Sequence, residues 1–284
     1  MATPTVFVCG ATGAQGGRLA RRLRAMGWGV HTTVRTPGSP AAQALSSIGV
    51  KITPGDWDDE SALKQSIAGC QKLFLNLYPT LHDFPHELKQ AQRILSIAKA
   101  AGVTQIVYSS GLAHEGSDPE SIPSRARASK RTIEQATRDA GFAAWTVLRP
   151  AYFMTNLVRP NVDVLYPGAS ATGVFTLAIG PDTTLPLIDP DDIARFAAAA
   201  FQHPDRFHGE TIDLAAEEVS MADILALLSR AAGRELRGNY LSDAEIEAQK
   251  RVNPFLIGQL DLRDGVRQLD LEKTKSWGVP LGSL

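Results

Sequence analysis

Three glycines near the beginning of the chain have the spacing of a phosphate-binding turn. Gly10, Gly13 and Gly16 lie between a β-branched run that starts at Val6 and an amphipathic helical pattern that ends at Gly27. The spacing is one residue wider than the G-x-G-x-x-G fingerprint, yet the demands are the same: positive φ in a tight turn and a backbone that a diphosphate can approach without meeting a Cβ atom. The following helix adds unpaired N–H groups and about half a positive charge. Because the triplet joins a strand to a helix, it predicts a dinucleotide site rather than a purely structural turn.

The residue that ends the second expected strand bears on the choice of nucleotide. An NAD site usually carries an acid there, which hydrogen-bonds the ribose 2′-hydroxyl. In the segment TTVRTP that position holds Arg35, whose planar guanidinium can clamp a 2′-phosphate and stack on the adenine. The alternative is a solvated loop arginine. We therefore expect NADP(H) as the cofactor in preference to NAD(H).

Strand-like and helix-like runs alternate through the first half of the chain. The strand-like segments are TVFVC, VHTTVR, VKIT, KLFLNL, TQIVYSS and AAWTVLRP, and amphipathic helical patterns separate them. Strands that are apolar on both faces are typical of a parallel sheet covered by helices on each side. With right-handed crossovers, this pattern predicts an α/β fold with a doubly wound parallel sheet of the Rossmann type.

The alternation of strands and helices breaks after Pro150, where turn residues become frequent. We place a domain boundary at this point, with an NAD(P)-binding domain over residues 1–152 and a smaller, mostly helical substrate or partner domain over residues 153–284. Strands expected near 185–188 and 210–214 are candidates to return to the main sheet.

Composition excludes several classes of protein. The net charge of −1 gives no broad field that would attract nucleic acid or an anionic membrane. Cys9 and Cys70 lack metal-ligand or redox spacing and are expected to be reduced thiols. The start, MATPTVFV, lacks the pattern of a secretory signal, and no apolar run is long enough to span a membrane. These features predict a soluble, cytoplasmic protein.

Several segments taken together resemble the NmrA-like family, an atypical branch of the short-chain dehydrogenase/reductase superfamily. They are GATGAQGG, VRTP, GDWDDESAL, FLNLYP, AKAAGVTQIVYSSG and WTVLRPAYFMTN, which follow the family pattern in order between residue 5 and about residue 215. The family contains NADP-sensing regulators that bind partner proteins and NADPH-dependent reductases of quinones and related compounds. The chain also resembles isoflavone and pinoresinol-type reductases.

The resemblance, combined with the glycine turn and the sheet pattern, assigns residues to the cofactor and to the substrate. It implies that Asp56 and Trp57 lie by the adenine, the segment 76–79 along the inner ribose, and Lys130 near the nicotinamide ribose. The cofactor-binding set is Gly10, Thr12, Gly13, Ala14, Gln15, Gly16, Arg35, Asp56, Trp57, Asn76, Tyr78, Ser109 and Lys130. The expected substrate-side residues are Ser110, which is a candidate to orient a substrate oxygen, and Tyr152, Phe153 and Asn156.

The segment SRARASKRTIEQ has a lysine without its usual partner. In ordinary short-chain dehydrogenases a tyrosine four residues before the lysine protonates the carbonyl oxygen, and this spacing puts both on one helix face. Here Ala126 stands four residues before Lys130. Because alanine cannot transfer a proton, the usual form of the reductase mechanism is excluded, whereas cofactor binding is not.

Three residues are candidates for the missing acid. Lys130 would serve if desolvation lowered its pKa, although it also lies in a basic helical segment that water can solvate. His114 has a suitable unperturbed pKa, but its plain alternative is a surface loop residue. Tyr152 is as well explained by packing as by chemistry.

Other constellations do not indicate a site. His82 and His86 are four residues apart but have no third ligand at helical spacing, so we expect no metal. The basic segment 125–131 lacks interleaved aromatic residues, and no DNA-reading module is present, so we expect no nucleic-acid partner.

Two classes of function remain open. The first is an NADPH-dependent reductase of a hydrophobic aromatic or quinone-like small molecule, since a hydroquinone product can take its protons from water. The second is a redox sensor that binds NADP(H) and passes its occupancy to a protein partner. An isomerase or cyclase using the same pocket is a third possibility.

Overall fold

The computed structural model describes residues 3–78, 80, 83–112, 118–265 and 269–284. The chain divides into two compact units, each made of several segments. The first unit comprises residues 1–111, 126–150 and 190–214, and the second comprises residues 112–125, 151–189 and 215–284. Of the helices in the described part of the chain, none combines the length and the apolar character that crossing a membrane requires.

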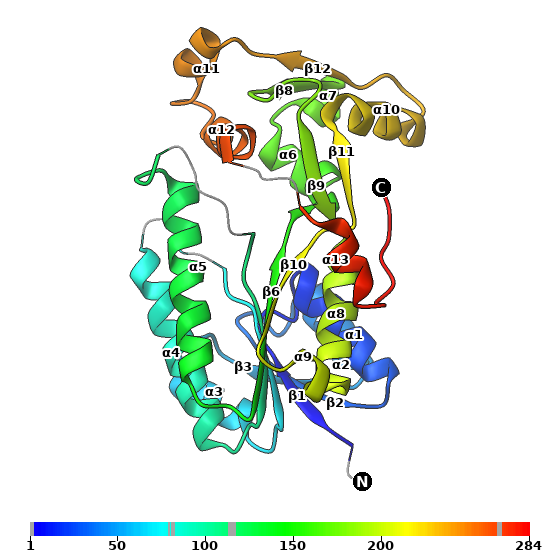
Figure 1. Ribbon diagram of the computed structural model, residues 1–284. Helices are drawn as coiled ribbons and strands as arrows, with labels where there is room; N and C mark the ends of the chain where they lie inside the picture. Colours follow the sequence, from blue (N-terminus) through cyan, green and yellow to red (C-terminus); the bar gives the residue numbers. More distant parts are fainter. Residues whose placement is uncertain (1–2, 79, 81–82, 113–117, 266–268) are drawn as a thin grey trace. The chain divides into compact units, whose positions relative to one another are not determined.

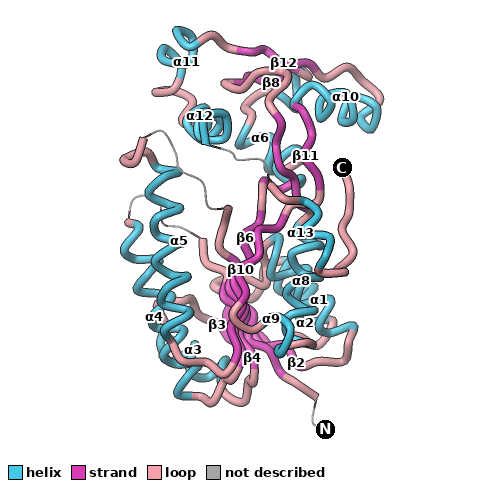
Figure 2. Tube along the Cα trace, in the orientation of Figure 1, coloured by secondary structure: helices cyan, strands magenta, loops and turns pink. Residues whose placement is uncertain are grey.

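The first unit is built on a seven-stranded sheet in which every neighbouring pair is parallel (Figures 1 and 2). Its order is β3-β2-β1-β4-β5-β6-β10. The strands are β1 (Thr5–Val8), β2 (Gly29–Val34), β3 (Lys51–Pro54), β4 (Lys72–Leu75), β5 (Gln105–Ser109), β6 (Ala144–Pro150) and β10 (Glu210–Leu214). The predicted doubly wound parallel sheet is thus confirmed.

Helices cover both faces of this sheet, as the alternating pattern requires (Figure 1). One face carries α3 (Glu60–Ile67), α4 (Phe84–Ala100) and α5 (Ile122–Asp139). The other face carries α1 (Ala14–Ala25), α2 (Pro40–Ser47) and α8 (Pro190–Gln202). The short α9 (Pro204–Phe207) follows directly after α8. Leu73, Ile94, Ile106 and Ile133 are fully buried between β4, β5, α4 and α5, so this layer is held by apolar packing.

The sheet reverses its strand order at β1. The chain runs from β1 to β2 and β3 on one side, and β4, β5 and β6 follow on the other. Sheets of this kind bind ligands at the carboxyl ends of the strands beside such a reversal. The turns after β1, β2, β4 and β5 therefore form the region in which a site is expected.

The two later strands have different partners. Residues 210–214 form β10, which pairs with β6 at the edge of the main sheet. Residues 184–188 form β9 (Thr184–Ile188), which lies instead in a three-stranded sheet of the second unit with the order β11-β9-β7. The chain then re-enters the first unit at Pro190, the first residue of α8, so the units are interleaved along the sequence.

The second unit contains short strands as well as helices. Its strands are β7 (Tyr152–Phe153), β8 (Val174–Leu177), β9, β11 (Glu217–Ser220) and β12 (Arg237–Tyr240). Its helices are the 3-10 turn η1 (Met154–Leu157), α6 (Asn161–Leu165), α7 (Ala169–Thr172), α10 (Met221–Ala232), α11 (Asp243–Gln249), α12 (Phe255–Gly265) and α13 (Leu271–Ser276).

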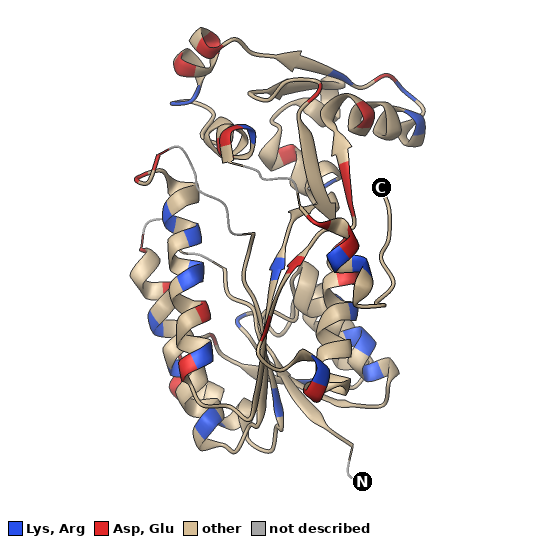
Figure 3. Cartoon of the chain, viewed as in Figure 1, with Lys and Arg blue, Asp and Glu red and all other residues tan. Residues whose placement is uncertain are grey.

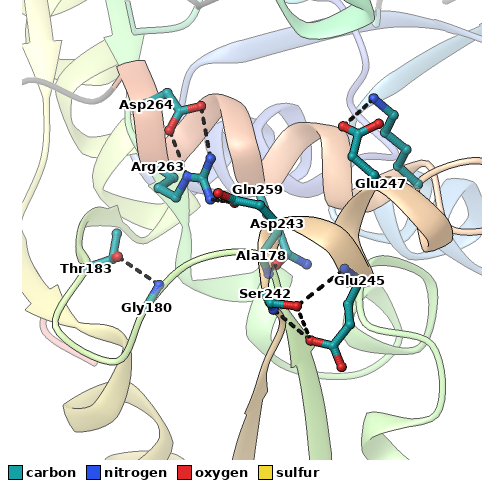
Figure 4. A network of polar contacts seen from close by, with 11 residues as sticks. Ala178, Gly180, Thr183, Ser242, Asp243, Glu245, Glu247, Gln259, Arg263 and Asp264 are labelled. Carbon is teal, nitrogen blue, oxygen red and sulfur yellow. Dashed lines mark hydrogen bonds and ion pairs between the residues drawn. The ribbon is translucent and has the colours of Figure 1, made fainter.

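Polar contacts attach α11 and α12 to the strand region of the second unit (Figure 4). The Gln259 side chain of α12 accepts a hydrogen bond from the Ala178 backbone N–H at 2.8 Å. Arg263 donates to Asp243 at 2.9 Å and so joins α12 to the first turn of α11. Leu256 is fully buried beside Ala178, which adds an apolar contact to the polar ones.

Candidate functional site

The glycine turn leaves the N-terminus of α1 bare. Gly10 has a φ of +65°, and the Gly13 N–H donates to its carbonyl oxygen at 2.9 Å. A Cβ atom at Gly16 would lie 2.5 Å from that same oxygen, so only glycine fits where the helix passes the turn. Gly13 is the N-cap and supplies no side-chain acceptor, which leaves the first N–H groups of α1 available to an anion.

Three polar side chains form a hydrogen-bonded row beside this turn. Ser109, the last residue of β5, donates from Oγ to Gln15 Oε1 at 2.6 Å. Gln15, in the first turn of α1, donates from Nε2 to Asn76 Oδ1 at 3.4 Å. A Cβ atom placed on Gly10 would lie 3.4 Å from Asn76 Nδ2, so the row borders the glycine turn directly. We call Gly10, Gln15, Asn76 and Ser109 the polar floor.

Other predicted cofactor residues surround the polar floor at the same ends of the strands. Thr12 and Ala14 are exposed in and just after the glycine turn. Arg35 is exposed immediately after β2, and Tyr78 follows β4 with 76% of its surface exposed. Exposure leaves these side chains accessible to a ligand, which is a condition for the predicted contacts.

The loop after β3 brings Trp57 to the glycine turn. A Cβ atom on Gly10 would lie 4.0 Å from Trp57 Cζ2. Asp56 Oδ1 accepts the backbone N–H groups of Asp58 at 2.9 Å and Asp59 at 3.0 Å, so one of its oxygens is used to shape the loop. The role of Asp56 beside the adenine stays a prediction, and its Oδ2 is the oxygen not used in these two bonds.

Asp58 connects this loop to α4. Its carboxylate accepts hydrogen bonds from His86 Nε2 at 3.0 Å, Gln90 Nε2 at 2.8 Å and Arg93 Nη1 at 2.9 Å. Arg93 also donates to the Trp57 carbonyl oxygen at 3.0 Å, which fixes the tryptophan backbone. Partial burial opposes ionisation, but the three hydrogen bonds prevail and lower the pKa of Asp58.

Sequence reasoning did not identify this network, although a signal was present. His86, Gln90 and Arg93 recur at helical spacing and so share one face of α4. The spacing of His82 and His86 instead draws attention to a metal pair, and His82 lies outside the described residues. Among the residues that the structure describes, no group of three or more His, Cys, Asp or Glu side chains has the arrangement of a metal site.

Lys130 points inward from α5, whereas its neighbour Arg131 is exposed. Its Nζ donates to the Leu77 carbonyl oxygen at 2.7 Å and to Glu87 Oε1 at 2.6 Å, and 15% of its side chain is exposed. Desolvation lowers the pKa of Lys130, and the Glu87 carboxylate opposes this shift. The ammonium is therefore held in the interior by α4 and the segment after β4, although several Lys and Arg residues follow one another along α5 (Figure 3).

Sequence reasoning also missed Glu87. Its side chain has no exposed surface, and its Oε2 accepts a hydrogen bond from Ser129 Oγ at 3.0 Å. It comes from α4 and meets two consecutive residues of α5. A glutamate within the amphipathic segment HELKQ gives no sign of burial, because only the packing of α4 on α5 determines its partner.

Ser110 is engaged by a different buried carboxylate. Its Oγ donates to Glu134 Oε1 at 2.8 Å. Glu134 also accepts from Arg149 at 2.8 and 2.7 Å and from Arg138 at 3.0 Å. The role of Ser110 in orienting a substrate oxygen stays a prediction; in this structure its single proton is donated to Glu134, which leaves its lone pairs for a ligand.

The remaining predicted residues lie in the second unit or outside the described residues. Tyr152 in β7 has its hydroxyl 2.9 Å from the Tyr166 hydroxyl. Burial, together with Tyr166, raises the pKa of Tyr152 well above its ordinary value, which makes it a weak proton donor at neutral pH. Phe153 is half-buried in β7, and Asn156 is half-buried in η1. His114 lies outside the described residues.

The two cysteines are poor nucleophiles. Cys9 and Cys70 are both buried. Burial raises the pKa of each thiol to about 12. Since the thiolate is the reactive form, neither residue is suited to covalent chemistry at neutral pH.

The chain is similar to proteins of one family in sequence and in fold. The NmrA-like family model matches residues 2–267. A (4-alkanoyl-5-oxo-2,5-dihydrofuran-3-yl)methyl phosphate reductase of Streptomyces griseus is 32% identical over 267 residues, covering 93% of this chain and 86% of that protein. An NADPH-dependent quinone oxidoreductase of Escherichia coli, complexed with NADPH, has a TM-score of 0.73 at 23% identity, covering 98% of this chain and 96% of the other. NmrA, a negative transcriptional regulator, in complex with NADP, has a TM-score of 0.76 at 20% identity, covering 100% and 93%.

Proposed function

The chain belongs to the NmrA-like family, and on that premise we propose that it is an NADPH-dependent reductase of a hydrophobic, conjugated small molecule such as a quinone or an enone. The observation that carries the proposal is the polar floor beside the bare N-terminus of α1. Ser109, Gln15 and Asn76 form one hydrogen-bonded row at the reversal of the sheet, where such folds bind nucleotides.

The residues present fit a dinucleotide. The glycine turn has no side chain at Gly10, Gly13 or Gly16, so a diphosphate can approach its backbone, and no side chain caps the first N–H groups of α1. Arg35 is exposed at the end of β2, where its guanidinium can pair with a 2′-phosphate. These features support NADP(H) in preference to NAD(H).

The proposed substrate class rests on relatives with named substrates. The Streptomyces griseus relative is a reductase of a dihydrofuran whose ring double bond is conjugated with carbonyl groups, and the Escherichia coli neighbour is a quinone oxidoreductase. Both substrates are electron-poor conjugated acceptors. A bound NADPH supplies a hydride to such an acceptor, and the protein contributes orientation and electrostatic stabilisation.

The arrangement of the candidate proton donors also favours this class of substrate. Ala126 replaces the usual tyrosine, the hydroxyl of Tyr152 is paired with Tyr166, and Lys130 is bound to Glu87. None of these three positions thereby presents a ready acid to a carbonyl oxygen. A quinone or an enone fits such a site because its reduced product can take protons from water.

The direct test is NADPH oxidation by purified protein with a panel of quinones and enones, followed at the absorbance of the reduced cofactor. We expect turnover with at least one acceptor class and a lower KM for NADPH than for NADH. Tight NADPH binding with no turnover on the whole panel would overturn the reductase proposal.

A second candidate function is favoured by Ala126. A chain that cannot protonate a carbonyl in the usual way can use the same site to sense NADP(H) and to bind a protein partner according to occupancy. NmrA, at 20% identity, is a regulator with this fold. A partner whose capture changes between NADP+ and NADPH, in a protein without turnover, would support the sensor.

A further inference from the structure

We propose that Glu87 is a positioning residue that holds the Lys130 ammonium charged and immobile, so that one N–H group remains for the cofactor ribose. The inference rests on the proposed function because it concerns the same cofactor site. Neither the glycine turn nor the missing tyrosine calls for a buried carboxylate on α4.

The contacts leave Lys130 little freedom. An ammonium has three N–H donors. In the part of the chain that the structure describes, two of them go to Glu87 Oε1 at 2.6 Å and the Leu77 carbonyl oxygen at 2.7 Å. Since Leu77 directly follows Asn76 of the polar floor, these bonds hold the ammonium next to the segment expected along the ribose. The third donor is the one left for a ligand.

Both carboxylate oxygens of Glu87 accept hydrogen bonds. Glu87 has no exposed surface, and its second oxygen accepts from Ser129 Oγ at 3.0 Å. A buried carboxylate needs a charged partner to compensate for lost hydration, and the same holds for the ammonium. Each ion therefore keeps the other charged. This arrangement opposes the use of Lys130 as a neutral amine or as a proton donor that loses its charge.

The neighbouring ionisable groups do not replace this pairing. Tyr108 of β5 is buried, and desolvation together with Glu87 and Glu134 raises its pKa, so the phenol stays neutral. On α5 itself, Glu134 lies one turn after Lys130 and is bound to Arg149 and Arg138, while Arg127 lies one turn before. On α4, His86 next to Glu87 is bonded to Asp58. Among the residues that the structure describes, Glu87 is thus the anion in contact with the Lys130 ammonium.

The test is the pH dependence of NADP+ binding, measured by calorimetry from pH 7 to pH 9.5. In the wild type we expect the dissociation constant to change little over this range. In Glu87→Gln the amide keeps the shape but not the charge, so the pKa of Lys130 falls further. Affinity should then drop about 10-fold as the lysine loses its proton, the scale of one charge-assisted hydrogen bond.

Two further variants separate charge from shape. Ser129→Ala removes the contact to Oε2 and a longer one, at 3.5 Å, to the Phe84 carbonyl oxygen, but it keeps the carboxylate and should retain the wild-type profile. Adding Lys130→Arg to Glu87→Gln restores a permanent charge and should abolish the pH dependence, whatever the absolute affinity. If Glu87→Gln does not fold, Glu87→Asp should show the same alkaline loss in weaker form, about 3-fold, because the shorter carboxylate cannot keep both contacts.

A profile of Glu87→Gln, or of Glu87→Asp in its place, that runs parallel to wild type would overturn the role of Glu87 and leave the proposed function intact. Wild-type protein that binds neither NADP+ nor NADPH would instead overturn the proposed function.

Discussion

Ser109 Oγ and Gln15 Oε1 lie 2.6 Å apart, although 94 residues separate them in the sequence. The bond joins the end of β5 to the first turn of α1 across the reversal of the sheet. It fixes the amide of Gln15, whose nitrogen then reaches Asn76 at 3.4 Å.

The first prediction concerns this row. Gln15→Ala removes both bonds, so Ser109 and Asn76 lose their common partner and the surface beneath the cofactor loses its order. We expect NADPH affinity to fall about 10-fold, measured by calorimetry, with little change in thermal stability because Gln15 is only half-buried. Gln43→Ala, which changes an exposed residue of α2, is the control. Unchanged NADPH affinity in Gln15→Ala would show that the polar floor does not contact the cofactor.

The second prediction concerns the close packing at Gly16. In Gly16→Ala the new methyl group would lie 2.5 Å from the Gly10 carbonyl oxygen and 2.7 Å from its carbon, so the backbone must move. We expect a loss of stability of about 2 kcal/mol or more, seen in urea unfolding. Gly38→Ala is the matched control because a Cβ atom there has no neighbour within 4 Å. Equal stability of the two variants would contradict the tight fit.

The third prediction concerns cofactor choice. Arg35→Ala removes the exposed guanidinium after β2, and we expect NADPH affinity to fall about 30-fold while NADH affinity changes little. Titration of both cofactors measures the ratio. Arg131→Ala removes an exposed arginine of α5 and should leave the ratio as it is. An equal loss for both cofactors would mean that Arg35 does not contact the 2′-phosphate.

The fourth prediction concerns the link from α4 to Trp57. Arg93→Ala removes the donor shared by Asp58 and the Trp57 carbonyl, which frees the loop expected beside the adenine. We expect about a 5-fold weaker NADPH affinity without loss of fold. Lys89→Ala, exposed on the same helix, should bind as wild type. Quenching of tryptophan fluorescence by NADPH offers a second measurement of the loop.

The fifth prediction follows from the ionisation of Asp58. Its pKa is lower in the folded protein than the ordinary value of 3.8. The carboxylate therefore contributes stability above its unfolded pKa, and this contribution is lost as the pH falls through the folded pKa. Urea unfolding of wild type and Asp58→Asn should differ most near neutral pH and converge in acid. A difference that grows on acidification would have the wrong sign.

The sequence predicts those features of this protein that depend on short-range patterns. Glycine spacing located the turn after β1, and apolar runs located the strands of the parallel sheet. Both depend on local demands: positive φ at Gly10, and burial of both sheet faces.

Features that depend on helix packing were not predictable. Glu87 meets Lys130 only because α4 lies against α5, and Asp58 meets Arg93 only because the loop after β3 reaches the same helix. The hydrogen bond that Ser110 donates to Glu134 likewise depends on how α5 packs against the end of β5. In each case the partner is a charged residue far away in the sequence, and the burial of Glu87 and Glu134 is not revealed by the sequence, since charged residues are seldom buried unless paired.

Adjacent residues of α4 serve opposite ends of the expected cofactor. His86 bonds Asp58 in the loop that we propose to lie by the adenine, whereas Glu87 bonds Lys130, which we propose to lie by the nicotinamide ribose. A single helix would thereby position the residues at both ends of the proposed cofactor, so a tilt of α4 would weaken both sets of contacts together. Engineers who wish to retune one half alone should leave this helix untouched and alter the strand-end loops instead.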